Sequence, residues 1–226
     1  MIVFDIETAG KRTPEAEDIL CSRIDDERKR EEILGSLGLN PFFCEIVSVA
    51  MRETTQPDMP TVVFLSAAIQ KTECEAMSDE HVQFRASSTG EKGMLEQVCN
   101  ALGKSTLWVT YNGRGFDVPV LALRCARYRL RPPSRLVDAN RYSGPHLDLH
   151  DVVTNFGAMW NLRGGLAGLC HLLGVPSPKG DLHGAEVGAA WDRGEYFRVG
   201  KYNAADVVAT EDCGRILGVI EDNNKG

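Results

Sequence analysis

The first predicted strand carries two carboxylates in an otherwise apolar run, and this pair constrains the fold more than any other feature. The chain begins MIVFDIET, in which Asp5 and Glu7 interrupt a β-branched, apolar stretch. Side chains alternate between the faces of a strand, so Asp5 and Glu7 share one face while Phe4 and Ile6 share the other. Like charges side by side repel, and burying either without a partner costs several kcal/mol. The fold must therefore supply a compensating partner on the acidic face.

Length and composition narrow the class of protein. The 226 residues are 43% hydrophobic and 25% charged, which suits a globular protein with a substantial core. No repeat, low-complexity tract or long linker divides the chain, so we expect a single domain over residues 1–226. The formal charge of -7 excludes a bulk polycation, and nucleic-acid binding would need a local basic patch or metal ions.

Cysteine usage and the N-terminus bear on localisation. The seven cysteines are scattered and contain no C-x-x-C pair, which predicts reduced thiols rather than a disulfide framework or zinc site. The first acids come too early for a signal peptide, and no run of about 18 apolar residues could span a membrane. We therefore expect a soluble cytoplasmic protein.

Residue patterns predict strands first and then alternating helices and strands, the order of a mixed sheet covered by helices. Predicted strands cover 2–6, 45–53, 61–68, 81–87, 106–112 and 146–149, with 45–53 and 61–68 antiparallel neighbours and 81–87 at an edge. Predicted helices cover 91–104, 118 to about 128, 152–156 and 166–173, and a last helical region includes 202 to about 220. The many charges between about residues 11 and 40, with apolar residues at roughly helical spacing, predict a solvated helical insertion. The alternative is a mobile lid over a site near Asp5.

Acids recur at two further points. Asp117 follows a glycine-rich turn, YNGRGF, that leaves a predicted strand. Tyr202 and Asp206 lie four residues apart on a predicted helix and so share a face. Hard divalent cations prefer oxygen ligands, and two ions about 4 Å apart can serve a phosphoryl transfer. These acids therefore suggest two-metal phosphodiester chemistry as a hypothesis. The hypothesis requires that the acids converge in the fold, which their spacing in the sequence does not establish.

The ordered motifs resemble those of DEDDy 3′–5′ exonucleases: D-x-E in the first strand, YNGRGFD, and Y-x-x-x-D near the end. YNGRGFDVPVL is especially similar to the second motif of the proofreading domain of family B DNA polymerases. The tail, from LAGLCHLLGVPSPKGDLHGAEV to YFRVGKYNAADVVAT, looks like stand-alone bacterial exonucleases related to that domain. The resemblance spans residues 4–210 and implies an α/β, ribonuclease H-like fold, a mixed five-stranded sheet flanked by helices.

The resemblance also implies roles for individual residues. Asp5, Glu7 and Asp206 would ligate two divalent ions, Mg²⁺ or Mn²⁺, with Asp5 bridging them. Asp117 would hold the second ion through water, and Tyr202 would orient the attacking water. Substrate contacts are expected from Thr8 at the terminal nucleotide and from Asn112 and Phe116.

Basic residues offer candidate phosphate contacts. Arginines that follow Asp117, interleaved with tyrosines, fit either a solvated surface or a groove along a nucleic-acid strand. They are Arg124, Arg127, Arg129, Arg131, Arg135 and Arg141, with Tyr128 and Tyr142. Arg163 and Lys179 are further candidates. HLDLHD, residues 146–151, predicts a strand with a polar face that brings Asp148 near the site, rather than a zinc centre.

The expected activity is removal of nucleotides from the 3′ end of single-stranded DNA, giving nucleoside 5′-monophosphates. RNA is the alternative substrate, because DEDDy enzymes that trim RNA carry the same acids. A non-catalytic nucleic-acid-binding module with the same fold is the alternative from another class. Expected partners are a nucleic-acid 3′ end and proteins of DNA replication or repair, with no membrane partner.

Overall fold

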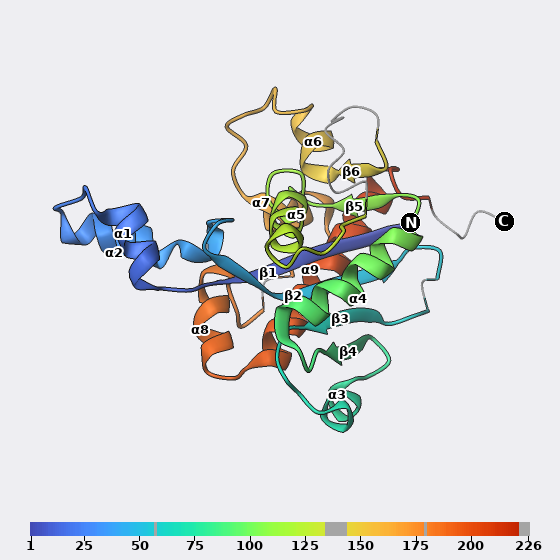
Figure 1. The fold of residues 1–226 in the computed structure, drawn as a ribbon. Helices are drawn as coiled ribbons and strands as arrows, with labels where there is room; N and C mark the ends of the chain where they lie inside the picture. The colour runs from blue at the N-terminus through green and yellow to red at the C-terminus, as the bar shows by residue number, and fades with distance from the viewer. Residues whose placement is uncertain (57, 134–143, 179, 222–226) are drawn as a thin grey trace.

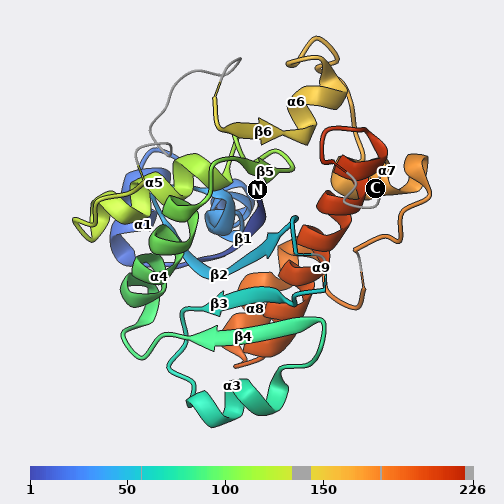
Figure 2. The same cartoon turned by 90° about the vertical axis from the view of Figure 1, so that its right-hand side faces the viewer.

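The central element is a mixed sheet of six strands in the order β4-β3-β2-β1-β5-β6 (Figures 1 and 2). The computed structural model describes residues 1–56, 58–133, 144–178 and 180–221. The strands are β1 Ile2–Gly10, β2 Cys44–Glu53, β3 Thr61–Leu65, β4 Val82–Ala86, β5 Trp108–Thr110 and β6 His146–Asp148. β2 is antiparallel to both β1 and β3, as predicted for β2 and β3, while β5 and β6 run parallel to β1.

The mixed sheet flanked by helices is confirmed, and the described residues form six strands where the resemblance implied five. β4 pairs in parallel with β3 along its whole length, from Thr61↔Val82 to Leu65↔Ala86. The pairing satisfies backbone groups of β3 that would otherwise form an open edge. Phe84 of β4 is buried and meets Phe197 edge-on, at 5.0 Å between ring centroids. The strand is therefore fixed by side-chain packing as well as by its backbone, and it is the edge strand that the sequence predicted.

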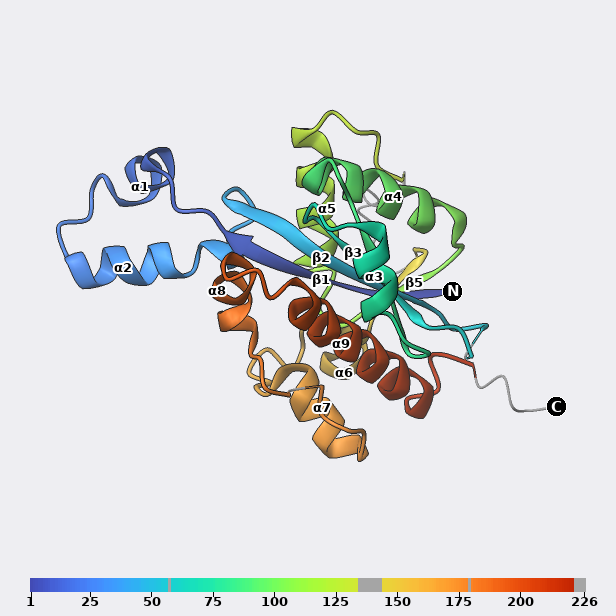
Figure 3. The same ribbon diagram turned by 90° about the horizontal axis from the view of Figure 1, so that it is seen from below.

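Helices cover both faces of the sheet (Figure 3). The helices are α1 Pro14–Cys21, α2 Glu27–Gly35, α3 Lys71–Met77, α4 Gly90–Lys104, α5 Asp117–Arg127, α6 Leu149–Thr154, α7 Gly165–Leu173, α8 Val187–Asp192 and α9 Tyr196–Ile216, with short 3₁₀ turns η1 Leu37–Leu39 and η3 Gly184–Glu186. α4 and α5 lie on one face, and α7, α8 and α9 on the other. Within the described residues, no helix has both the length and the apolar character needed to cross a membrane.

The alternation of β1 decides which face receives its acids. Phe4 and Ile6 belong to the core under α4 and α5, whereas Val3 belongs to the core under α7 and α9. Asp5 and Glu7 have the parity of Val3 and therefore lie on the α9 face. The acidic face that the sequence predicted is thus directed at α9.

Residues of the predicted insertion form α1, α2 and η1, and of these α1 and α2 project beyond the end of the sheet (Figures 1 and 3). Cys21, Leu34 and Leu37 form a small buried cluster of their own. η1 returns against β1, where a Cβ on Gly10 would lie 2.5 Å from the backbone nitrogen of Gly38. This close approach requires glycine at position 10. Whether the insertion acts as a lid stays a prediction.

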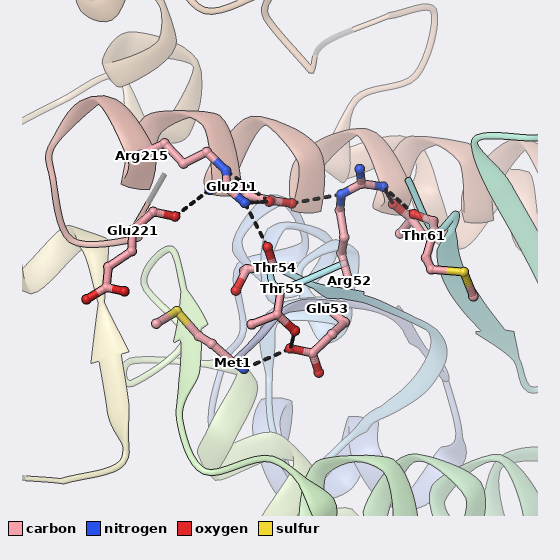
Figure 4. Close-up of polar contacts among 10 residues, drawn as sticks. Met1, Arg52, Glu53, Thr54, Thr55, Thr61, Glu211, Arg215 and Glu221 are labelled. Carbon is pink, nitrogen blue, oxygen red and sulfur yellow. Dashed lines mark hydrogen bonds and ion pairs between the residues drawn. The ribbon is translucent and has the colours of Figure 1, made fainter. Parts of the chain in front are cut away.

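α9 is fixed to the sheet along its length. Near its start, a Cβ on Gly200 would lie 2.7 Å from the ring of Phe84, so glycine lets the helix backbone approach β3 and β4 closely. Near its end, the buried Glu211 accepts from Arg52 Nε at 2.8 Å and from Arg215 Nε at 3.1 Å (Figure 4). Arg215 also donates to the Thr54 carbonyl at 3.0 Å. The side chains between these two anchors are held in register with β1 and β2.

Candidate active site

Three carboxylates from β1 and α9 converge on one point. Asp5, Glu7 and Asp206 each offer an oxygen, and these oxygens lie within 4.8 Å of one another. All three residues are partly exposed, so an ion can reach them from solvent. Asp5 and Glu7 are adjacent because of the strand period, and Asp206 reaches them because α9 packs across β1. The structure thus brings together the three residues expected to bind metal directly.

Asp117 reaches the same strand by a different route. β1 pairs with β5 only at Ile2 and Val3, after which the strands separate. The freed amide of Ile6 donates to Asp117 Oδ1 at 3.1 Å, and Asp117 is itself buried. The fourth predicted acid therefore lies beside β1 between Asp5 and Glu7, although it is not one of the three clustered oxygens. Asp117 is the first residue of α5, and Phe116 is the N-cap.

Asp148 fixes the loop that delivers Asp117. Its carboxylate accepts from the backbone amides of Asn112 at 2.7 Å, Arg114 at 2.8 Å and His150 at 2.9 Å. Asn112 has a left-handed backbone, φ 61°, at the turn out of β5. The strand predicted over 146–149 ends at Asp148, because α6 begins there with Asp148 as its N-cap; His150 is therefore helical and does not share a strand face. Asp148 supports the site through the loop.

Tyr202 and Asp206 lie one turn apart on α9, as predicted. Tyr202 is half-buried, and burial together with the charges of Asp206, Glu7 and Asp5 raises the pKa of its phenol. A hydrogen bond to Asp206 acts in the same direction. The phenol therefore remains protonated at neutral pH and is available as a hydrogen-bond donor.

The cluster is electrostatically unfavourable without a cation. Burial and then the charges of Asp117, Asp206 and Glu7 raise the pKa of Asp5 well above its usual value. Burial and neighbouring acids likewise raise the pKa of Glu7. For Asp117, burial raises the pKa to about 7 despite backbone hydrogen bonds that favour its ionised form. Mutually repelling carboxylate oxygens are the donors that hard divalent cations prefer, so this set fits such an ion.

Asn203 is part of the site and was missed from the sequence. Its Nδ2 donates to Asp5 Oδ2 at 2.7 Å, and its Oδ1 accepts from Ser48 Oγ at 2.9 Å. Both Asn203 and Ser48 are fully buried. The amide therefore orients Asp5 from beneath. In the sequence, Asn203 is marked only by its position directly after Tyr202. One residue further along a helix is a rotation of about 100°, which turns the Asn203 side chain toward the sheet.

The residues predicted to contact substrate lie in different environments. Thr8 donates to the Gly38 carbonyl at 2.6 Å, which ties β1 to η1. Asn112 is exposed, and Phe116 packs partly against the core under α4 and α5. Arg163 lies exposed between α6 and α7. Lys179 lies outside the described residues.

The basic stretch after Asp117 does not form the groove as a whole. Arg124 is buried and pairs with Glu91, whose carboxylate also accepts from the amide of Ile46 and the hydroxyl of Tyr128. Arg124 is therefore a structural residue, which corrects the groove interpretation for it. Arg127, Arg129 and Arg131 are exposed. Arg135, Arg141 and Tyr142 lie outside the described residues.

Comparison with known proteins identifies the family. Residues 52–211 match the family described as "Predicted 3'-5' exonuclease related to the exonuclease domain of PolB". The chain belongs to this family. The matched region includes Asp117, Tyr202 and Asp206, but it begins after the residues of β1 that carry Asp5 and Glu7. No match was found among the curated proteins.

A solved structure supports the fold of this exonuclease. The family B DNA polymerase from the hyperthermophilic archaeon Pyrobaculum calidifontis superposes with a TM-score of 0.61 at 16% sequence identity. The similarity covers 96% of this chain and 24% of the polymerase chain. This chain therefore spans about a quarter of the length of that polymerase, and the likeness concerns the fold.

Proposed function

We propose that this exonuclease hydrolyses the terminal phosphodiester of single-stranded DNA from the 3′ end, by a two-metal mechanism that releases nucleoside 5′-monophosphates. The observation that carries the proposal is the convergence of Asp5, Glu7 and Asp206, with Asp117 beside them on β1. Bound Mg²⁺ or Mn²⁺ ions would stabilise the charge on the attacking and leaving oxygens. Asp5, Glu7 and Asp206 would hold them directly, and Asp117 from the β5 side.

The chain's own groups have separate tasks in this proposal. Asn203 and the rigid β1 backbone hold Asp5 in one orientation. Tyr202, with its raised pKa, orients the attacking water by hydrogen bonding and does not remove its proton. A cavity of about 410 Å³ adjoins Tyr202 and is lined in part by Lys201 and Phe197. Lys201 adds a positive charge to the wall of this cavity.

DNA is proposed over RNA because the family is related to the exonuclease domain of a DNA polymerase. The test uses DNA and RNA oligonucleotides of one sequence, 5′-labelled and 3′-labelled, with Mg²⁺, Mn²⁺ or chelator. We expect 5′-labelled DNA to shorten stepwise only with metal. Degradation of RNA alone would identify an exoribonuclease. Binding without shortening of either polymer would identify a non-catalytic module.

Asp206→Asn is the matched test of the cluster, with Asp192→Asn on the exposed end of α8 as control. We expect Asp206→Asn to lower kcat by roughly 10³-fold, because metal-supplied charge stabilisation amounts to several kcal/mol. Asp192→Asn should retain wild-type activity. Equal activity of the two variants would show that the cluster does not catalyse.

Tyr202→Phe tests the positioning of water, with Tyr196→Phe on the same helix as control. We expect Tyr202→Phe to lower kcat by about 10- to 100-fold, because misplaced reactants react more slowly, and to leave the Mn²⁺ dissociation constant unchanged. Equal losses in kcat and metal affinity would contradict the role assigned to the phenol.

A further inference from the structure

The connection between α6 and α7 exposes a concentration of large apolar side chains. We call residues 155–163 the aromatic turn; every one of them is exposed. Trp160 is 82% exposed, Met159 55% and Leu162 46%, and Phe156 shows a further exposed ring. Apolar groups gathered on one surface segment mark an interaction site more often than single exposed residues do.

Hydrogen bonds give the aromatic turn a defined shape. The amide of Phe156 donates to the Asp151 carbonyl at 2.7 Å, and the amide of Met159 donates to the Thr154 carbonyl at 3.0 Å. Asn155 and Phe156 both adopt left-handed backbones, with φ of 49° and 55°. Two consecutive non-glycine residues in this region are strained, and such strain concentrates at functional sites. The rings are thus displayed by an ordered backbone.

Charge in this part of the chain favours a polyanionic ligand. From residue 152 to residue 180 the sequence contains no aspartate or glutamate, although the whole chain has 32 of them and a net charge of -7. Arg163 is exposed at the end of the aromatic turn. A phosphate backbone would meet strong repulsion from most of this acidic protein but not from this segment.

The aromatic turn begins at the same end of the sheet as the active site. β1, β5 and β6 are parallel, so their C-termini lie at one end of the sheet. Asp117 follows β5 there, and α6 with the aromatic turn follows β6 (Figure 2). At its other end, the turn leads into α7, which shares a core with α9. One end of the turn therefore follows the strand that pairs with β5, and the other leads into a helix that packs on α9.

We propose that the aromatic turn binds unpaired bases of the substrate strand upstream of the 3′ end, with Trp160 as the stacking surface and Arg163 at a phosphate. The proposal rests on the proposed function, which makes a single strand the substrate. Every base has a π-face, so stacking of this kind tolerates any sequence. A second copy of the chain or another protein could also cover apolar groups, but neither explains the acid-free segment.

Intrinsic fluorescence and binding test the proposal in the full chain with Ca²⁺ and oligo(dT) of 12 nucleotides. The three tryptophans differ in exposure: Trp108 is fully buried, Trp191 half-buried and Trp160 exposed. In a Trp191→Phe background, we expect the oligonucleotide to quench Trp160. Trp160→Ala should raise the dissociation constant for the 12-mer by about 5- to 100-fold. Leu172→Ala, at another exposed apolar residue on α7, should not.

Kinetics then separate this subsite from the catalytic centre. Trp160→Ala should raise KM for the 12-mer more than for a dinucleotide, which is too short to reach the aromatic turn. Unaltered 12-mer binding by Trp160→Ala, or a change in oligomeric mass alone, would overturn the proposal. Hydrolysis by the wild type without any Trp160 response would overturn it and leave the proposed function standing. Quenching without hydrolysis would support the subsite and contradict the catalytic proposal.

Discussion

Asn203 divides its amide between Asp5 and Ser48, at 2.7 and 2.9 Å, with no exposure to solvent. Partners that orient a metal ligand typically contribute 10- to 100-fold in metal affinity or activity. We therefore expect Asn203→Ala to weaken Mn²⁺ binding, measured by calorimetry, and to lower kcat, each by about 10- to 100-fold. Asn100→Ala, on the exposed side of α4, is the matched control. Wild-type metal affinity in Asn203→Ala would show that β1 alone positions Asp5.

Sequence reasoning at the residue scale found the acids but not their supports. Asp5 and Glu7 could be placed on one face because the strand period is local, and the four-residue spacing of Tyr202 and Asp206 is equally local. Asn203 acts on Asp5 across 198 positions of sequence. Asp148 accepts hydrogen bonds from loop residues Asn112 and Arg114, which lie 36 and 34 positions before it in the sequence. No local pattern encodes such contacts.

At the scale of elements, the ion-pair cluster at Glu211 attaches the end of α9 to the β2–β3 region (Figure 4). Glu211→Gln would remove the negative charge that pairs with both Arg52 and Arg215. Breaking fully buried pairs costs about 3–5 kcal/mol; here we expect roughly 2–3 kcal/mol, because both arginine side chains are nearly one-fifth exposed. Urea denaturation measures this loss in the free energy of unfolding.

Glu75→Gln is the control for that prediction. Glu75 pairs with Lys71 at 3.5 Å on α3, where its side chain is 62% exposed. Exposed helix pairs of this spacing contribute about 0.3–0.5 kcal/mol. Similar losses in Glu75→Gln and Glu211→Gln would mean that the buried cluster does not anchor α9.

Helices and strands were predicted correctly where apolar residues recur regularly on one face. They were missed where contacts with distant parts of the chain determine the structure. β2 and β3 were predicted as antiparallel neighbours, and the helix over 91–104 corresponds to α4 within a residue. α3 was missed, because Cys74 is its single buried residue and gives no helical period. The last helical region was predicted to include 202 to about 220, and α9 runs from Tyr196 to Ile216, with Phe197 near its start packed on Phe84.

Repulsion between the clustered carboxylates lowers the stability of the whole folded protein. The chain carries a net charge of -7, and it places the carboxylate of Asp117 beside the cluster of Asp5, Glu7 and Asp206. Local rules of polar burial are broken here, as they are at functional sites in general. A divalent cation that binds only the folded state would offset the repulsion and stabilise the whole fold by mass action.

The metal-free protein should therefore lose stability as pH rises. Asp117 has a usual pKa of 3.8 and a folded-state pKa of about 7, so the folded state holds a proton that the unfolded state has released. Stabilisation of the protonated folded form is complete below about pH 4 and is lost as pH rises to 7. The raised pKa values of Asp5 and Glu7 act in the same direction.

His146 acts in the opposite direction, because burial lowers its pKa to about 4 from 6.5. Its contribution grows only up to pH 6.5, and one histidine opposes three acids. Each pKa unit corresponds to about 1.4 kcal/mol, so we expect a net loss of a few kcal/mol between pH 5 and pH 7 in chelator. Thermal and urea unfolding measure it.

Mg²⁺ at pH 7 should restore the lost stability, and Asp117→Asn should reduce the pH dependence while Asp192→Asn should not. If the chelated protein is equally stable at pH 5 and pH 7, then the carboxylates are not in conflict in the folded state. A flat profile in chelator, combined with stabilisation by Mg²⁺, would instead place the ion's stabilising effect outside this cluster. Only a falling profile that both the metal and Asp117→Asn flatten supports the assignment, because the same four carboxylates must then account for both responses.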